Sequence, residues 1–169
     1  TNLSTNINGT LADIDALLSV IGLDDGDKLI LDDTGSVSSR SGTLTLGSLT
    51  GFAMSGSINF SGVSEFELNL GEHSDELLIT GTDAKTVTTI DLGDGNNSVM
   101  VSDAGQLDPI SGRLNIIGGE SQDLLSLDDS QDGDAAQGIL TANSSTQAKL
   151  IGFGIGAADN ATPNDQKGI

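Results

Sequence analysis

The side chains of this sequence that could do chemistry are mainly carboxylates, and many of them stand close to glycine. The chain has 25 Asp and Glu residues against six Lys and Arg, a formal net charge of −19 at pH 7. Such a surface attracts divalent cations and repels phosphate backbones and anionic lipid. No stretch is apolar for long enough to span a bilayer. We therefore expect neither a nucleic-acid partner nor insertion into a membrane.

One acidic loop has part of the spacing of a calcium-binding loop. Asp128, Ser130 and Asp132 place oxygens at its first, third and fifth positions, and Gly133 stands at the sixth. This matches the front half of an Asp-x-Asp-x-Asp-Gly loop, but Ile139 stands at the twelfth position, where a glutamate is expected. Asp128 and Asp132 are therefore candidate metal ligands, and the alternative is a solvated acidic loop.

Groups suited to catalysis are sparse in this sequence. His73 is the only histidine, and its neighbours Ser74 and Asp75 point to other sides of a strand or turn, so they form no triad. Cysteine and tyrosine are absent, which leaves no His/Cys zinc cluster. The adjacent carboxylates Asp32 and Asp33 suit a turn better than a hydrolase pair. We expect no enzymatic activity; a β-helical polysaccharide-binding or polysaccharide-cleaving protein is the less favoured alternative.

A later part of the sequence repeats an earlier part at a shift of 96 residues. After an insertion of five residues the match continues, with residues 49–52 (Leu-Thr-Gly-Phe) meeting residues 150–153 (Leu-Ile-Gly-Phe). Residues 1–169 are predicted to hold one full repeat and most of a second, with starts near residues 9 and 105, and we expect a longer parent array. The matched pairs include Leu11 and Leu107, Ile14 and Ile110, Leu18 and Leu114, Asp27 and Asp123, Leu29 and Leu125, Leu31 and Leu127, Asp32 and Asp128, Asp33 and Asp129, Gly42 and Gly138, and Leu44 and Leu140.

A shorter period lies inside the long one and is marked by an acidic or amide residue that ends a glycine turn. These anchor residues are Asp27, Asp75, Asn97 and Asp123. Their separations are 48, 22 and 26 residues, which are multiples of about 24, and four such steps make the 96-residue repeat. One expected anchor, near Gly51, is replaced by an apolar stretch.

Each short period has the pattern of a strand, a turn and a second strand. Apolar and polar residues alternate at 68–70 and 90–92, and the apolar runs at 77–79, 99–101 and 125–127 follow clusters of Gly, Asp or Asn. Strands that recur about every 24 residues, with four Phe and no Trp or Tyr, favour a chain coiled into stacked parallel sheets. We predict an all-β fold, a parallel β-solenoid with coils of about 24 residues; the alternative is an antiparallel β-sandwich.

The glycine turns resemble those of the repeats-in-toxin (RTX, haemolysin-type) family of calcium-binding β-rolls, whose motif is Gly-Gly-x-Gly-x-Asp-x-apolar. Residues 118–125, Gly-Gly-Glu-Ser-Gln-Asp-Leu-Leu, keep both leading glycines and Asp123 but have Ser in place of the third Gly. Residues 93–97, Gly-Asp-Gly-Asn-Asn, keep a glycine pair and end in Asn97. The 96-residue repeat as a whole is similar to the long β-solenoid repeats of very large bacterial surface and adhesin proteins.

The resemblance implies calcium bound between neighbouring turns. Calcium takes six to eight hard oxygens, which carboxylates and backbone carbonyls supply. The family's turns recur every nine residues and these recur about every 24, so some sites are expected to be single or absent. The candidate ligands, with the two residues of the acidic loop included, are Asp25, Asp27, Asp75, Asp94, Asn97, Asp123, Asp128 and Asp132.

These observations together predict a non-enzymatic, calcium-stabilised structural repeat module of a large secreted or cell-surface bacterial protein, such as the stalk or spacer of an adhesin or matrix protein. The alternative is a self-assembling extracellular fibre subunit that stacks head to tail, because an uncapped solenoid presents unpaired strand edges at both ends. The expected partners are neighbouring repeats or copies of the same chain, end to end, and surface or matrix glycans.

Overall fold

The computed structural model of this chain describes residues 2–5, 9–23, 26–133, 138–142 and 148–152, with side chains at 9–23 and 26–133. Regular secondary structure in these ranges consists of β-strands, which confirms the predicted all-β class. The strands form two large sheets and one separate pair. That pair is β13 (Gly138–Ala142) and β14 (Ala148–Gly152), which run antiparallel.

The smaller of the two large sheets has five strands, and every neighbouring pair in it is parallel. Parallel neighbours cannot be joined by a tight turn, so the chain must leave the sheet between them. In order across the sheet, the strands are β1 (Asn2–Thr5), β3 (Lys28–Asp32), β7 (Glu65–Asn69), β9 (Val87–Asp91) and β11 (Leu114–Ile117).

The other large sheet has seven strands and is mixed. Within it, β5 runs antiparallel to both of its neighbours, β4 and β6, and all other neighbouring pairs are parallel. In order across the sheet, the strands are β12 (Leu124–Leu127), β10 (Ser98–Val101), β8 (Glu76–Ile79), β4 (Ser41–Leu44), β5 (Ser48–Gly51), β6 (Ile58–Ser61) and β2 (Leu18–Ile21).

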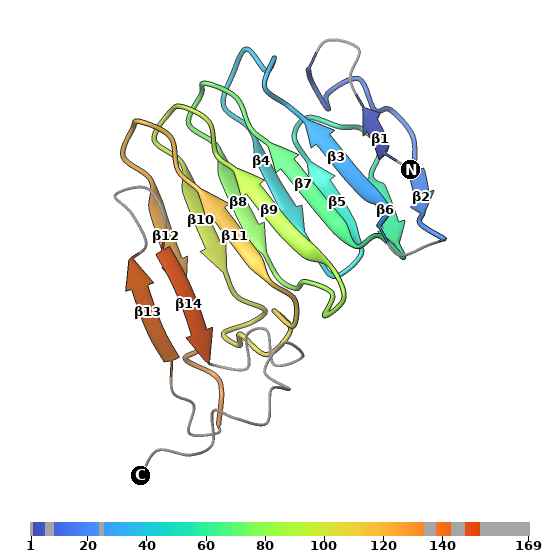
Figure 1. The fold of residues 1–169 in the computed structure, drawn as a ribbon. Helices are drawn as coiled ribbons and strands as arrows, with labels where there is room; N and C mark the ends of the chain where they lie inside the picture. The colour runs from blue at the N-terminus through green and yellow to red at the C-terminus, as the bar shows by residue number, and fades with distance from the viewer. Residues whose placement is uncertain (1, 6–8, 24–25, 134–137, 143–147, 153–169) are drawn as a thin grey trace.

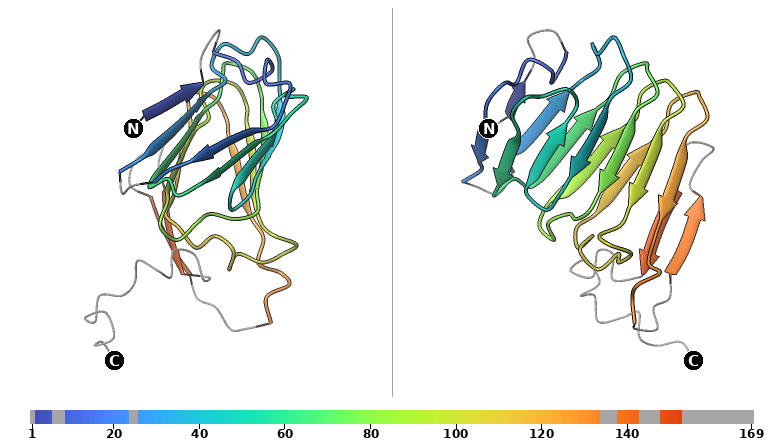
Figure 2. Two further views of the ribbon diagram at one scale, coloured as in Figure 1. Left: turned by 90° about the vertical axis from the view of Figure 1, so that its right-hand side faces the viewer. Right: turned by 180° about the vertical axis from the view of Figure 1, so that it is seen from behind.

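From β6 to β12 the chain passes from one sheet to the other at every turn. Two successive strands, one in each sheet, form a unit: β6–β7, β8–β9 and β10–β11. Figures 1 and 2 show the sheets as two facing layers, with successive units side by side. Such facing sheets are common to the predicted solenoid and to its sandwich alternative.

The alternation is interrupted at β4, β5 and β6, which all remain in the seven-stranded sheet. β4 and β5 form a hairpin in which Gly42 faces Gly51. The ring of Phe52 lies over Gly42 so closely that a Cβ atom at Gly42 would be 2.0 Å from it. Phe52 is fully buried and has a left-handed φ of 50°. This hairpin occupies the place of the missing anchor near Gly51.

The core lies between the two sheets and is mainly aliphatic. Along β3 and β7 alternate residues are buried, as the period of a strand requires. Leu29 faces Phe66 and Leu31 faces Leu68 across the β3–β7 ladder, and all four are at most 1% exposed. The ring of Phe66 stacks on that of Phe60 from the facing sheet, with centroids 4.7 Å apart.

The two sequence copies share two strand pairings. β1 pairs with β3 from Asn2↔Lys28 onward, and β10 pairs with β12 from Ser98↔Leu124 onward, the same register 96 residues later. The hairpin β13–β14 likewise repeats the hairpin β4–β5. The copies also differ: β13–β14 forms a separate pair, and β1 and β3 lie in the five-stranded sheet whereas β10 and β12 lie in the seven-stranded sheet. Equivalent strands therefore lie on opposite faces of the molecule.

Candidate functional site

Three of the four predicted anchor residues lie in one column at a corner of the fold. Asp75, Asn97 and Asp123 each stand immediately before a strand of the seven-stranded sheet, namely β8, β10 and β12. Because these strands pair in parallel with matched starts, the turns that precede them stack. We call the turns at 71–75, 93–97 and 119–123 the corner column.

The anchor side chains connect each turn of the column to the previous one. The backbone N–H of Asp75 donates to Asn97 Oδ1 at 2.8 Å, and the N–H of Asn97 donates to Asp123 Oδ1 at 3.0 Å. Asp75 Oδ1 in turn accepts from the N–H of Arg40, which precedes β4, at 2.7 Å. A buried N–H group without a partner is costly, so these bonds hold successive turns together.

Asn97 is the most completely bonded residue of the column. It is 2% exposed, and its Nδ2 donates within its own turn to the carbonyls of Leu92 and Gly95, both at 3.2 Å, and of Asp94 at 3.3 Å. The same amide group lies 3.0 Å from Asp123 Oδ1. One side chain thus closes its own turn and bonds to both neighbouring turns.

Glycine is required in the column because the turns touch backbone to backbone. A Cβ atom at Gly93 would lie 2.3 Å from the carbonyl oxygen of Gly71, and one at Gly119 would lie 1.9 Å from that of Gly93. Gly93 also has a left-handed φ of 62°. The glycines therefore set the close spacing that the anchor hydrogen bonds need.

Two buried carboxylates near the column each have an oxygen without a partner. Asp75 is 2% exposed and Asp33 is fully buried, and Oδ2 of each accepts no hydrogen bond. Desolvation by burial is the largest effect and raises the pKa of both groups above the ordinary value. The hydrogen bond from Arg40 to Asp75, the hydrogen bond from Leu11 to Asp33 and the charge of Arg40 offset only part of this rise. The charge of Asp75 also raises the pKa of Asp33. A proton or a cation at these oxygens would relieve the cost of burying charge.

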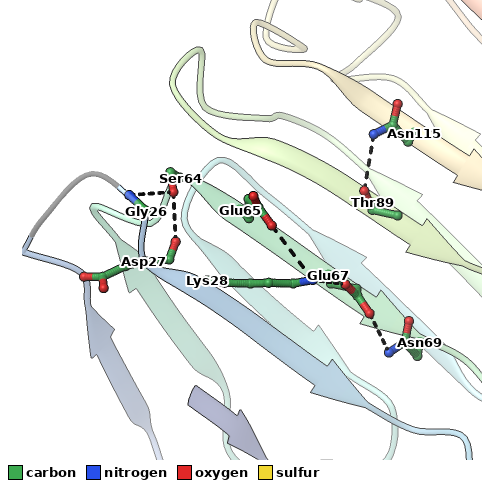
Figure 3. Close-up of polar contacts among 9 residues, drawn as sticks. All are labelled: Gly26, Asp27, Lys28, Ser64, Glu65, Glu67, Asn69, Thr89 and Asn115. Atoms are coloured by element: carbon green, nitrogen blue, oxygen red, sulfur yellow. Dashed lines mark hydrogen bonds and ion pairs between the residues drawn. The ribbon is translucent and has the colours of Figure 1, made fainter. Parts of the chain in front are cut away.

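The fourth anchor, Asp27, lies at the opposite corner, before β3 of the five-stranded sheet. Its Oδ2 accepts from the N–H of Leu23 at 2.9 Å. Figure 3 shows Ser64 between Gly26 and the carbonyl oxygen of Asp27, with both contacts at 3.1 Å. Asp27 and its sequence equivalent Asp123 are therefore far apart in the fold, because the two copies lie in opposite sheets.

Beside this second corner, Lys28 binds two glutamates of β7 on the outer face of the five-stranded sheet (Figure 3). Its hydrogen bond with Glu67 raises the pKa of Lys28 and lowers that of Glu67. The contact with Glu65 is longer, at 3.9 Å. Further along the same face, Asn115 Nδ2 donates to Thr89 Oγ1 at 3.3 Å. These contacts join neighbouring strands and are partly open to solvent.

The acidic loop after β12 is a turn with internal hydrogen bonds. Asp128 Oδ1 accepts from the N–H of Ser130 at 3.0 Å, and hydrogen bonds from Ser130 lower the pKa of Asp128. The N–H of Asp132 donates to the carbonyl of Asp129 at 3.2 Å. The equivalent turn in the first copy has the same bond, from the N–H of Thr34 to Asp32 Oδ1.

Of the other candidate ligands, Asp94 lies in the corner column, with an exposed side chain and a carbonyl that accepts from Asn97. Asp25 lies outside the residues that the structure describes. No group of three or more His, Cys, Asp or Glu side chains within the described ranges is arranged to hold a metal ion. Asp33 and Asp75 are only two carboxylates and do not make up a group of three.

Sequence reasoning missed a pair of capping aspartates. Asp33 Oδ1 accepts from the N–H of Leu11 at 2.8 Å, and Asp129 Oδ1 accepts from the N–H of Leu107 at 3.0 Å. Each carboxylate ties the start of its copy to the turn that follows β3 or β12. The signal was present, because both the aspartates and the leucines match at the 96-residue shift.

No known protein family, curated protein or solved structure matches this chain. No helix in the described part of the chain has the length and apolar character needed to cross a membrane.

Proposed function

We propose that this chain is a non-enzymatic structural repeat module, a β-solenoid segment that serves as a stalk or spacer in a large secreted or cell-surface bacterial protein. The single observation that carries the proposal is the corner column, in which each turn is hydrogen-bonded through an anchor side chain to the turn before it. Such bonds run along the direction in which units stack, so they stiffen the chain in that direction.

The strand pairings support the solenoid form of the proposal. Parallel ladders join β8, β10 and β12 in one sheet and β7, β9 and β11 in the other. A protein that stacks the same unit again and again gains length without needing a larger core. This suits a spacer better than an enzyme, which needs a pocket with tuned acid and base groups.

Calcium is part of the proposal as a stabilising ion. The charge of −19 opposes compact stacking, and a divalent cation would offset it. The unpartnered oxygens of Asp33 and Asp75 are the described groups most in need of a cation. Calcium prefers carboxylate oxygens of this kind.

The structural role is tested with proteins of one, two and three tandem 96-residue copies. From β2 to its equivalent β11 the chain crosses between the sheets seven times, which is three and a half two-strand units per copy. At about 4.8 Å per unit, each added copy should lengthen the particle in small-angle X-ray scattering by roughly 17 Å. The melting temperature should also rise with copy number, because each new interface adds stability. Independent globules with constant melting temperature would contradict the proposal.

Calcium is tested separately by thermal unfolding of the chain in calcium and in EGTA. Calcium should raise the melting temperature by several degrees through binding to the folded state. The double variant Asp33→Asn, Asp75→Asn should lose most of this response, whereas Asp94→Asn, at an exposed position, should keep it. Identical melting curves for the wild type in both buffers would remove calcium and leave the structural role intact.

A further inference from the structure

The end of the molecule formed by β11 and β12, which we call the open end, can be compared with the equivalent strands of the first copy. These strands are the sequence equivalents of β2 and β3, and each is the last strand of its sheet. In the first copy, β2 and β3 are covered by the unit β6–β7. Within the described residues no such unit pairs with the open end, because the hairpin β13–β14 that follows β12 pairs only with itself.

The exposure of equivalent leucines measures the difference. Leu29 and Leu31 of β3 are fully buried, whereas their counterparts Leu125 and Leu127 of β12 are 41% and 37% exposed. Leu124 is 63% exposed. Residues of the same type in the same register are therefore buried in one copy and open in the other. The missing cover is a parallel strand such as β7, which brings Phe66 and Leu68 onto Leu29 and Leu31.

The turn beside the open end has a glycine whose equivalent in the first copy is in close backbone contact with a further unit. In the first copy Gly22 and Gly62 touch, since a Cβ atom on either would lie 2.1 or 2.3 Å from the carbonyl oxygen of the other. Gly118 is the equivalent of Gly22. A Cβ atom at Gly118 would meet only Asp123 of its own turn. Gly118 is therefore open to a glycine from a further unit.

We infer that the open end binds a β6–β7 unit supplied by another copy of this repeat. β7 of the incoming copy pairs with β12 so that Phe66 faces Leu125 and Leu68 faces Leu127. β6 of the incoming copy pairs with β11 so that Ile58 faces Leu114. Gly62 of that copy makes a close backbone contact with Gly118. This inference rests on the proposed structural function and adds to it the identity and the register of the partner segment.

Among the positions that differ between the two sites, Lys28 provides a specific test of the inference. Lys28 of β3 binds Glu65 and Glu67 of β7, but its counterpart in β12 is Leu124. The open end therefore lacks the cation that an incoming β7 would meet. Replacing Leu124 with Lys should restore this ion pair and tighten binding by a few fold.

The test measures binding of a labelled synthetic peptide of residues 57–70 to the full chain by fluorescence anisotropy. The wild-type peptide should bind saturably, and the peptide variants Gly62→Val and Phe66→Asp should bind at least about tenfold more weakly. The change Leu124→Lys in the protein should strengthen binding, and a peptide with Glu65→Gln and Glu67→Gln should lose that gain. These peptide changes leave the fold of the protein untouched.

The register of the bound peptide is measured by disulfide cross-linking. The sequence contains no cysteine, so introduced cysteines are the sole thiols that can react. Ile30 of β3 faces Glu67 of β7, and Ser126 is the equivalent of Ile30. A Ser126→Cys protein should form a disulfide with a Glu67→Cys peptide faster than with Glu65→Cys or Asn69→Cys peptides. Equal binding of a scrambled peptide, or cross-linking without register preference, would overturn the inference. Lengthening of tandem copies would still support the structural function in that case.

Discussion

Asp75 and Asn97 occupy the same place in adjacent turns of the corner column, and they are bonded to different degrees. Asn97 uses its amide nitrogen on carbonyls of its own turn and on Asp123, and its amide oxygen on Asp75. Asp75 uses Oδ1 on Arg40 and leaves Oδ2 buried without a partner. Both side chains are 2% exposed, so solvent does not make up the difference.

The difference shows two ways of closing the same turn. An amide supplies both donors and acceptors, so the protein alone satisfies the corner. A carboxylate supplies only acceptors when ionised, so the turn keeps a charge that a proton, Arg40 or an external cation must offset. One turn is thus closed by protein groups, and the next responds to its surroundings.

The largest effect is expected where the stacking on which both turns depend is broken. Gly93→Ala places a Cβ atom 2.3 Å from the Gly71 carbonyl in a left-handed conformation, which should lower the free energy of unfolding by about 3 kcal/mol or more. Urea denaturation measures the loss. Gly133→Ala, where no atom lies within 4 Å of the new Cβ, serves as the control and should change stability little. Equal effects of the two substitutions would mean that the turns are not in contact.

Removal of the amide tests the well-bonded turn directly. Asn97→Ala leaves the N–H of Asp75 and several turn carbonyls without partners, at an expected cost of about 2–4 kcal/mol in the free energy of unfolding. Asn115→Ala removes a single outer-face bond to Thr89 and should cost no more than about 0.5 kcal/mol. A loss below 1 kcal/mol for Asn97→Ala would show that the column contributes little.

Making the two turns alike should stabilise the chain. In Asp75→Asn the new amide can donate to the carbonyls that correspond to those bonded by Asn97, at positions 70, 72 and 73. The free energy of unfolding is expected to rise by about 1 kcal/mol, and the reverse change Asn97→Asp should lower it. Chemical denaturation without calcium measures both. Destabilisation by Asp75→Asn would mean that the negative charge of Asp75 stabilises the fold, for example through its attraction to the positive charge of Arg40.

The smallest effect is expected in the pH dependence of stability. Burial raises the pKa values of Asp33 and Asp75 above the ordinary value of 3.8, so the folded chain binds these protons more tightly than the unfolded chain. The stability gained from protonation is complete below 3.8 and is lost as the pH rises through the raised values. The wild type should therefore lose more stability from pH 4 to pH 7 than the double variant Asp33→Asn, Asp75→Asn. Parallel pH profiles would contradict the burial of these charges.

Much of the column was predictable from the sequence because its determinants are local. Glycine and Asx residues mark the turns, and the separations of Asp75, Asn97 and Asp123 give the period of the units. The all-β class followed from the same period. What sequence spacing does not contain is which oxygen meets which N–H group, and the caps Asp33 and Asp129 were missed for this reason.

The position of Asp27 was not predictable from its match to Asp123. The sequence indicated a missing anchor near Gly51, but not that β4, β5 and β6 stay in one sheet there. With that hairpin included, the chain crosses between sheets seven times from β2 to β11, which is an odd number. Equivalent residues therefore end on opposite sheets, a result of topology that no local pattern encodes.

The exchange of sheets between the copies sets the symmetry of any array built from them. In such an array each copy would continue the previous one after half a revolution, so consecutive copies would be related by a two-fold screw along the array. The smallest translational repeat would then be two copies, and a glycan, epitope or binding loop carried at one position would project alternately to opposite sides of the array.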